Sequence, residues 1–245
     1  MITLDQIWYE GKGRQSFRFF NDAAEWKQMD KAGHIYSGYY VSAATKELLA
    51  WSGLQEQKSV WIGAVAGFVM LSSIEYFDGR SLAYGASVSD VGANLVGSAL
   101  FLAQSRRGGA LRLQPKFSFH FTDLAALRPS LLGHGAEEII KDYNGQTYWF
   151  SWQPVTRPES RWPHWLGVSV GYGAHNMIYA RDEQNQSNGW DPHRQYYVSV
   201  DLFTHALPIK SKVLKGVLSV FRVIKFPAPA MAFSRKGVKF HPFYF

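Results

Sequence analysis

Polar pairs interrupt three apolar, Gly- and Ala-rich stretches in the first half of the chain. The members of each pair are three or four residues apart, so both can lie on one face of a helix. Ionisable groups on apolar helices are costly to desolvate, and they are therefore normally paired with one another or functional. We expect helices that bring these faces together. The pairs are Asp30 with His34, Glu75 with Asp78, and Asp90 with Asn94.

Residues 22–107 are predicted to form a compact bundle of about four helices. Asp22 followed by Glu25 resembles a capping box, so a first helix is expected to begin there and run toward Lys31. Further helices are expected over residues 34–51 and 88–104.

The stretch 59–74 carries no charged residue. A membrane-spanning helix needs about 20 residues, so this shorter stretch is predicted to form a buried helix. Gly63 and Gly67 are spaced as a small-residue pair that permits close approach of another helix, and Ala93 with Gly97 repeats that spacing.

Beyond residue 108 the period of the sequence changes to that of β-strands. Residues 166–173 place large apolar side chains on one face and Gly or Ser on the other, and residues 196–202 continue the alternation. This pattern, with the aromatic C-terminal residue Phe245, resembles outer-membrane strands. Only five or six strands are found, whereas a closed barrel needs about eight, so a soluble antiparallel sheet is the alternative. The polar residues 182–191 are expected to form a solvated hairpin loop.

The C-terminal part of the chain is basic. The net charge is +7, and no acidic residue follows Asp201. Residues 209–225 predict an amphipathic basic helix, which either lies on a membrane interface or covers a sheet edge with its basic face in water. Anionic lipid headgroups are the expected partner, and no nucleic-acid motif accompanies these charges.

The composition limits the remaining possibilities. Aromatic residues make up 16% of the chain, including nine Trp. Soluble domains can be this aromatic, but Trp and Tyr also concentrate where a protein meets a membrane interface, which is the interpretation we favour. The absence of cysteine excludes thiol catalysis, disulfides and Cys-type zinc sites. The N-terminal residues show no signal-peptide pattern, so the chain is either cytoplasmic or has had its signal peptide removed or left out.

The polar residues of the helical region form the candidate site. Asp, Glu, His and Asn side chains could bind a metal ion. Alternatively, Lys31, His34 and Arg80 could bind a phosphate while a carboxylate acts as a base. We favour a third interpretation, in which a buried hydrogen-bond network fixes the register of the helices. No specific motif assigns a catalytic residue, a metal or a cofactor. The set is Asp30, Lys31, His34, Glu75, Asp78, Arg80, Ser89, Asp90 and Asn94, with Ser87 beside it.

Three motifs within this set resemble a known family. They are Asp30-Lys-x-x-His34, Glu75-x-x-Asp78-Gly79 and Ser89-Asp90-x-x-x-Asn94-x-x-Gly97. The pattern is similar to that of domain of unknown function 2279, whose members are described as predicted periplasmic lipoproteins, and more distantly to that of VanZ-like membrane proteins. The resemblance implies a location in the cell envelope of a Gram-negative bacterium and brings no known activity. Because the sequence contains no cysteine, the lipid-modified residue of a lipoprotein has no counterpart here.

We therefore predict an α+β fold in which a helical bundle packs on or in a C-terminal antiparallel sheet or small outer-membrane-type barrel. The expected parts are an arm at residues 1–21, a bundle at 22–107 and a β region at 108–245. The preferred function is that of a non-enzymatic, structural or accessory protein of the outer membrane or periplasm. Membrane lipid is its expected partner, and it could be a subunit of an envelope complex. The alternative is a protein that binds a metal or phosphate ligand, or a hydrolase, with its site at His34, Glu75, Asp78, Asp90 and Asn94.

Overall fold

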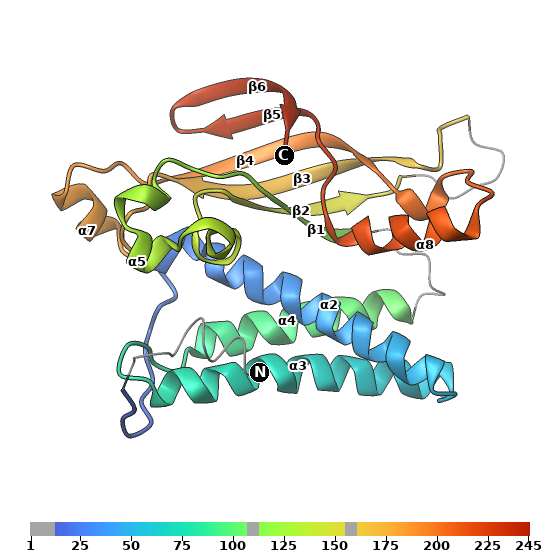
Figure 1. The fold of residues 1–245 in the computed structure, drawn as a ribbon, viewed down its shortest axis with the longest axis horizontal. Helices are drawn as coiled ribbons and strands as arrows, with labels where there is room; N and C mark the ends of the chain where they lie inside the picture. The colour runs from blue at the N-terminus through green and yellow to red at the C-terminus, as the bar shows by residue number, and fades with distance from the viewer. Residues whose placement is uncertain (1–12, 107–112, 155–160) are drawn as a thin grey trace. The chain divides into compact units, whose positions relative to one another are not determined.

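The computed structural model describes residues 13–106, 113–154 and 161–245. Most of the predicted N-terminal arm lies outside these residues. The chain divides into two compact units, one within residues 1–24 and 31–106 and the other within residues 25–30 and 107–245 (Figure 1).

Three long helices build the first unit: α2 (Met29–Trp51), α3 (Glu56–Arg80) and α4 (Val88–Ser105). The predicted helices at 34–51 and 88–104 are confirmed, although α2 begins five residues earlier. The helix predicted to begin at Asp22 is wrong. A short turn, η1 (Glu25–Gln28), precedes α2 instead, and Trp26 and Lys27 have left-handed backbone angles there. Asp22 does not cap a helix, because its carboxylate accepts hydrogen bonds from Ser87 and Ser89.

Glycines allow the three helices to approach closely, as the small-residue spacing predicted. A Cβ atom on Gly67 of α3 would lie 2.1 Å from Ser42 Oγ of α2. A Cβ atom on Gly97 of α4 would lie 2.2 Å from the carbonyl oxygen of Ile35. No larger residue fits at either position without displacing a neighbouring helix.

Gly97→Ala is therefore expected to lower the free energy of unfolding by about 1–3 kcal/mol, the usual cost of overpacking. The obstacle is a backbone carbonyl, which cannot rotate away as a side chain can. Chemical denaturation measures the change. Gly92→Ala on the same helix is the matched control: nothing lies within 4 Å of its added Cβ, so the better helix propensity of Ala should stabilise it slightly. Equal effects of the two substitutions would contradict the close packing.

The prediction that the uncharged stretch 59–74 is a buried helix is wrong. It lies within α3, whose 25 residues are long and apolar enough to cross a membrane by length and composition. Only the face that carries Gly63 and Gly67 is buried. Large apolar side chains on the rest of the helix are exposed: Trp61, Ile62, Val65, Val69 and Met70.

The second unit contains a six-stranded antiparallel sheet in which every strand pairs with its neighbour in sequence (Figure 1). The strand order β1-β2-β3-β4-β5-β6 leaves β1 and β6 at the edges. The described strands therefore form an open sheet, so the α+β fold is confirmed and the alternative of a closed barrel is not. The strands are β1 (Leu113–Phe119), β2 (Gln146–Trp152), β3 (Leu166–His175), β4 (His193–Leu202), β5 (Ala228–Ser234) and β6 (Gly237–Tyr244).

Short helices connect the strands. They are α5 (Pro129–Leu132), α6 (Glu138–Lys141), α7 (Asp182–Ser187) and α8 (Lys212–Val220), with the 3-10 turns η2 (Ala125–Leu127), η3 (Gly135–Glu137), η4 (Thr204–Ala206) and η5 (Phe221–Val223). The hairpin loop expected at 182–191 thus contains a helix. The buried Asn185 fixes it, because its amide accepts from the backbone N–H groups of Ile178 and Tyr179 and donates to the carbonyl of Arg181.

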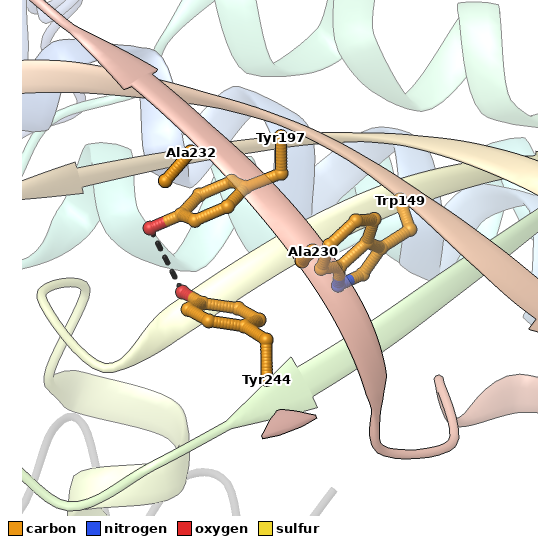
Figure 2. Close-up of a cluster of buried hydrophobic side chains, with 5 residues drawn as sticks. All are labelled: Trp149, Tyr197, Ala230, Ala232 and Tyr244. Atoms are coloured by element: carbon orange, nitrogen blue, oxygen red, sulfur yellow. Dashed lines mark hydrogen bonds between the residues drawn. The ribbon is translucent and has the colours of Figure 1, made fainter. Parts of the chain in front are cut away.

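The two faces of the sheet differ in character. One face is buried and carries small or polar residues together with an aromatic cluster of Trp149, Tyr197 and Tyr244, which packs around Ala230 and Ala232 (Figure 2). The Tyr244 hydroxyl donates to the Tyr197 hydroxyl at 2.9 Å. Gly171 makes room for the cluster, since a Cβ there would lie 2.7 Å from the Trp149 ring.

The opposite face of the sheet is apolar, and it is exposed except at one end, where Trp26 and Met29 pack against Tyr148, Tyr172 and Ala174. One row of side chains crosses five neighbouring strands in register and is 37–58% exposed. We call this row the outer belt; it consists of Phe150, Val170, Val198, Met231 and Phe240. Tyr196, Val200, Phe233 and Val238 on the same strands are exposed as well.

Candidate functional site

Polar residues of the first unit gather where its three helices meet. Lys31 and His34 come from α2, Glu75 from α3, and Asp90 and Asn94 from α4. Glu75, Asp90 and Asn94 are buried. We call the following set the polar cluster: Asp22, Lys31, His34, Glu75, Ser87, Ser89, Asp90 and Asn94.

Lys31 holds one side of the polar cluster together. Its ammonium lies 2.6 Å from Asp22 Oδ2 and 2.9 Å from Asp90 Oδ1. The Asp22 carboxylate also accepts from the hydroxyls of Ser87 and Ser89, at 2.5 and 2.9 Å. Burial raises the pKa of Asp22, but the bonds from Lys31 and Ser87 outweigh it and lower this pKa to about 2. Asp22 is therefore ionised throughout the physiological range.

Ser87 connects α4 to Glu75. Its hydroxyl caps α4 by accepting from the backbone N–H of Asp90 at 3.0 Å. Its own backbone N–H donates to Glu75 Oε2, also at 3.0 Å. Burial raises the pKa of Glu75 to about 8, and the negative charge of Asp90 adds to this increase. The hydrogen bond from Ser87 lowers the pKa but only partly offsets these effects.

The orientation of His34 follows from its contact with Asn94. His34 Nδ1 lies 2.9 Å from Asn94 Oδ1. Because an amide oxygen only accepts, Nδ1 carries the proton in this arrangement. Nε2 then faces Glu75 Oε1 and Asp90 Oδ2, each 3.9 Å away.

Nε2 of His34 and the carboxylate of Asp90 lie close enough to be ligands of one cation. A separation of 3.9 Å is too long for a hydrogen bond, and it is of the order found between two ligands of one metal ion. A neutral imidazole and carboxylates suit divalent cations. The second ring nitrogen of a metal-binding His usually donates to an oxygen, as Nδ1 does here.

Three predicted site residues have other surroundings. Arg80 is exposed, and its guanidinium donates to the hydroxyl of Tyr76 at 3.2 Å. The predicted phosphate set of Lys31, His34 and Arg80 is therefore not assembled as proposed from the sequence. Asp78 is half-buried on α3 and acts on Glu75 through its charge. Asp30 belongs to the second unit, where it accepts from the Tyr143 hydroxyl at 2.9 Å.

Sequence reasoning missed Asp22 as a member of the polar cluster. It lies before α2 in a segment without helical spacing, so no periodic pattern connects it to Lys31 or Ser87. Its sequence context instead suggested a helix cap.

A second buried charge cluster, also missed, lies in the sheet unit. Lys116 Nζ is 2.8 Å from Asp201 Oδ2, and Lys225 Nζ is 3.7 Å from Asp201 Oδ1. All three residues are buried. Lys225 also donates to the carbonyl of Val200 at 2.7 Å and lies 5.1 Å from the centre of the Trp149 ring. The sequence could have indicated this cluster. Lys116 is two residues from Ser118, and Asp201 is two residues from Ser199, so both charged residues lie on the same face of the sheet as these small residues.

Burial lowers the pKa of Lys225 from 10.5 to about 8. The folded chain therefore binds fewer protons than the unfolded chain between these values, and stability rises with pH across this window. Lys225→Met should remove this rise, so the difference in unfolding free energy between wild type and variant should change by on the order of 2 kcal/mol between pH 8 and 10.5.

Urea denaturation at several pH values measures this difference, and Lys239→Met, at an exposed position, is the control. Curves of wild type and Lys225→Met that stay parallel across the window would contradict a buried, partly deprotonated Lys225.

The fold and the site together define an α+β protein in which a three-helix unit is built around a polar cluster and a six-stranded antiparallel sheet exposes an apolar face. Residues 18–104 match the family DUF2279, which is described as predicted periplasmic lipoprotein. The match covers the helices of the first unit and the polar cluster, so the family resemblance is confirmed for this segment. It supports an envelope protein and brings no activity. The more distant VanZ-like resemblance stays a prediction. No curated protein and no solved structure matches the chain.

Proposed function

We propose that this chain is a membrane-associated structural or accessory protein of the cell envelope, and that the outer belt contacts lipid. The observation that carries the proposal is the row of exposed apolar side chains in register across five strands. Monomeric soluble proteins rarely expose contiguous apolar patches of this kind, and larger ones mark interaction or membrane sites.

The small and polar residues on the buried face support lipid as the partner. Ser151, Ser169 and Ser199 alternate with members of the outer belt along β2, β3 and β4, and all three serines are buried. This apolar-out, polar-in alternation is that of strands which face lipid. The exposed apolar residues of α3 give the first unit a second surface of the same character.

The length and pairing of the strands favour a position on the membrane surface over a spanning one. A spanning strand needs about 9–11 residues, whereas β1, β2 and β5 have seven each. The sheet is also open, with β1 and β6 at its edges and only a single bridge, from Phe117 to Ile224, described on the outer side of β1; open sheet edges are not tolerated in the hydrocarbon region. The outer belt would therefore rest in the interfacial layer of one leaflet.

Flotation of the full-length chain with phosphatidylcholine vesicles tests this proposal. Wild type should float with the lipid. Val170→Glu combined with Val198→Glu should shift the chain to the aqueous fraction by at least tenfold, because each change removes apolar contact and places a charge at the interface. Both positions are exposed and lie directly opposite each other on β3 and β4, so the two like charges should cost no more than about 1 kcal/mol of stability and leave the chain folded.

The matched control adds the same two charges elsewhere. Gln184→Glu combined with Gln186→Glu changes exposed residues of α7, and it should float like wild type. The proposal fails if wild type stays in the aqueous fraction, or if the Val170/Val198 variant floats equally well.

A second candidate function is favoured by the geometry at His34. A divalent cation could be held by Nε2 of His34 and the carboxylate of Asp90, with Glu75 Oε1 3.9 Å from the same nitrogen. Asn94 Nδ2 is buried and makes no hydrogen bond within the described structure, and a water on such a cation would give it an acceptor.

Calorimetric titration of the purified chain with Zn²⁺ or Mn²⁺ tests this candidate. Stoichiometric binding that Glu75→Gln abolishes and Glu47→Gln preserves would support it; Glu47 is an exposed carboxylate on α2. Absence of binding by wild type would leave the polar cluster with a structural role.

A further inference from the structure

Helix α8 turns its apolar side toward solvent. Four apolar side chains of α8 and the adjoining η5 are 41–78% exposed. Their spacing places them along one side of the helix. They are Val213, Leu214, Val217 and Phe221.

The C-terminal end of α8 is attached to the rest of the unit. The Thr204 hydroxyl donates to the carbonyl of Leu218 at 3.2 Å, and the helix packs against η4 and η5. The alternative from the sequence, in which residues 209–225 cover a sheet edge with their basic face in water, holds for the end of this segment, where Ile224 pairs with Phe117 of the edge strand β1. It does not account for the exposed apolar residues of α8 itself. In the structure the apolar side chains point outward.

The charge around α8 has a single sign. No acidic residue follows Asp201, whereas eight lysines and arginines do. Lys215 is exposed on the helix, and Lys210 is exposed just before it. An exposed apolar side, with Lys215 on the polar side of the same helix and Lys210 just before it, is complementary to an anionic lipid surface, in which acyl chains lie directly beneath negative headgroups.

We propose that α8 lies in the plane of an anionic membrane surface, with its four exposed apolar side chains inserted and its lysines at the headgroups. This inference rests on the proposed membrane association and names the lipid class that the protein selects. The outer belt would supply contact that does not depend on headgroup charge, and α8 would supply the preference for anionic lipid.

Flotation of the full-length chain with two vesicle compositions tests the inference: phosphatidylcholine alone, and phosphatidylcholine with 30% phosphatidylglycerol (about one lipid in three). Wild type should bind the anionic vesicles more tightly, and salt should reduce the difference. Lys210→Gln combined with Lys215→Gln should weaken binding to the anionic vesicles roughly 30-fold, because each basic residue near the surface contributes about 1 kcal/mol. Its binding to neutral vesicles should not change.

Two further variants complete the test. Val217→Asp should weaken binding to anionic vesicles, since it places a charge among the inserted side chains, whereas Arg181→Gln, at an exposed position just before α7, should have no effect. Equal binding of wild type to both compositions, or an unchanged Lys210/Lys215 variant, overturns the role of α8 while vesicle binding itself persists. If wild type binds neither composition, the proposed membrane association fails as well.

Discussion

Replacing Asp201 by Ala is expected to lower the free energy of unfolding by about 3–5 kcal/mol. The carboxylate lies between the ammonium groups of Lys116 and Lys225, and all three side chains are almost fully buried. Without it, two cations would remain in a low-dielectric interior with only backbone carbonyls, a hydroxyl and aromatic rings around them. Urea denaturation near pH 7 measures the loss.

Two comparisons separate this effect from general damage. Asp191→Ala removes an exposed carboxylate that pairs with Arg235, and it should cost no more than about 1 kcal/mol. Asp201→Ala should become less harmful as the pH rises above 8, because Lys225 loses its proton in that range. A loss for Asp201→Ala as small as that for Asp191→Ala would contradict a buried charge cluster.

Replacing Lys31 by Met should cost about 3 kcal/mol. The substitution retains an unbranched side chain of similar length, but it removes the ammonium that Asp22 and Asp90 both contact. These carboxylates are largely buried, with side-chain exposures of 15% and 6%, so water compensates for the lost charge only in part.

The cost should depend on pH in a defined direction. Lys31 helps to hold the pKa of Asp22 at about 2 in the folded state, below its ordinary value of 3.8. This contribution to stability is present above pH 4 and is lost as the pH falls toward 2. The difference between wild type and Lys31→Met should therefore shrink on acidification. Lys58→Met, at an exposed position of α3, should change stability little at any pH, and a matching effect of the two substitutions would contradict the bridging role of Lys31.

The polar cluster was predictable in part because its members repeat at helical spacing. His34, Glu75, Asp90 and Asn94 converge as the pattern of polar pairs indicated. Arg80 lies close to Glu75 in the sequence but is exposed. Spacing along a helix shows which residues share a face, but it does not show which face the neighbouring helices cover. Asp22 reaches the cluster from a non-helical segment, so periodicity could not identify it.

The exposed state of α3 could not be read from its composition. The same apolar stretch suits the core of a soluble protein and the surface of a membrane protein, and only the placement of Gly63 and Gly67 against α2 shows which face is covered. The sheet posed a similar difficulty. The alternation along β3 and β4 correctly predicted two unlike faces. Closure into a barrel would require the edge strands β1 and β6 to pair with each other, and the alternation carries no information on that pairing.

Membrane contact through the outer belt can be measured at a single residue. The chain contains no cysteine, so Val198→Cys can carry the only nitroxide label, with Asn188→Cys, at an exposed position after α7, as the reference. In the presence of phosphatidylcholine vesicles, the label at position 198 should collide with oxygen, which partitions into lipid, more often than with a water-soluble nickel chelate, and the label at position 188 should show the reverse. Preferential collision with the nickel chelate at both positions would mean that the apolar face of the sheet does not meet lipid.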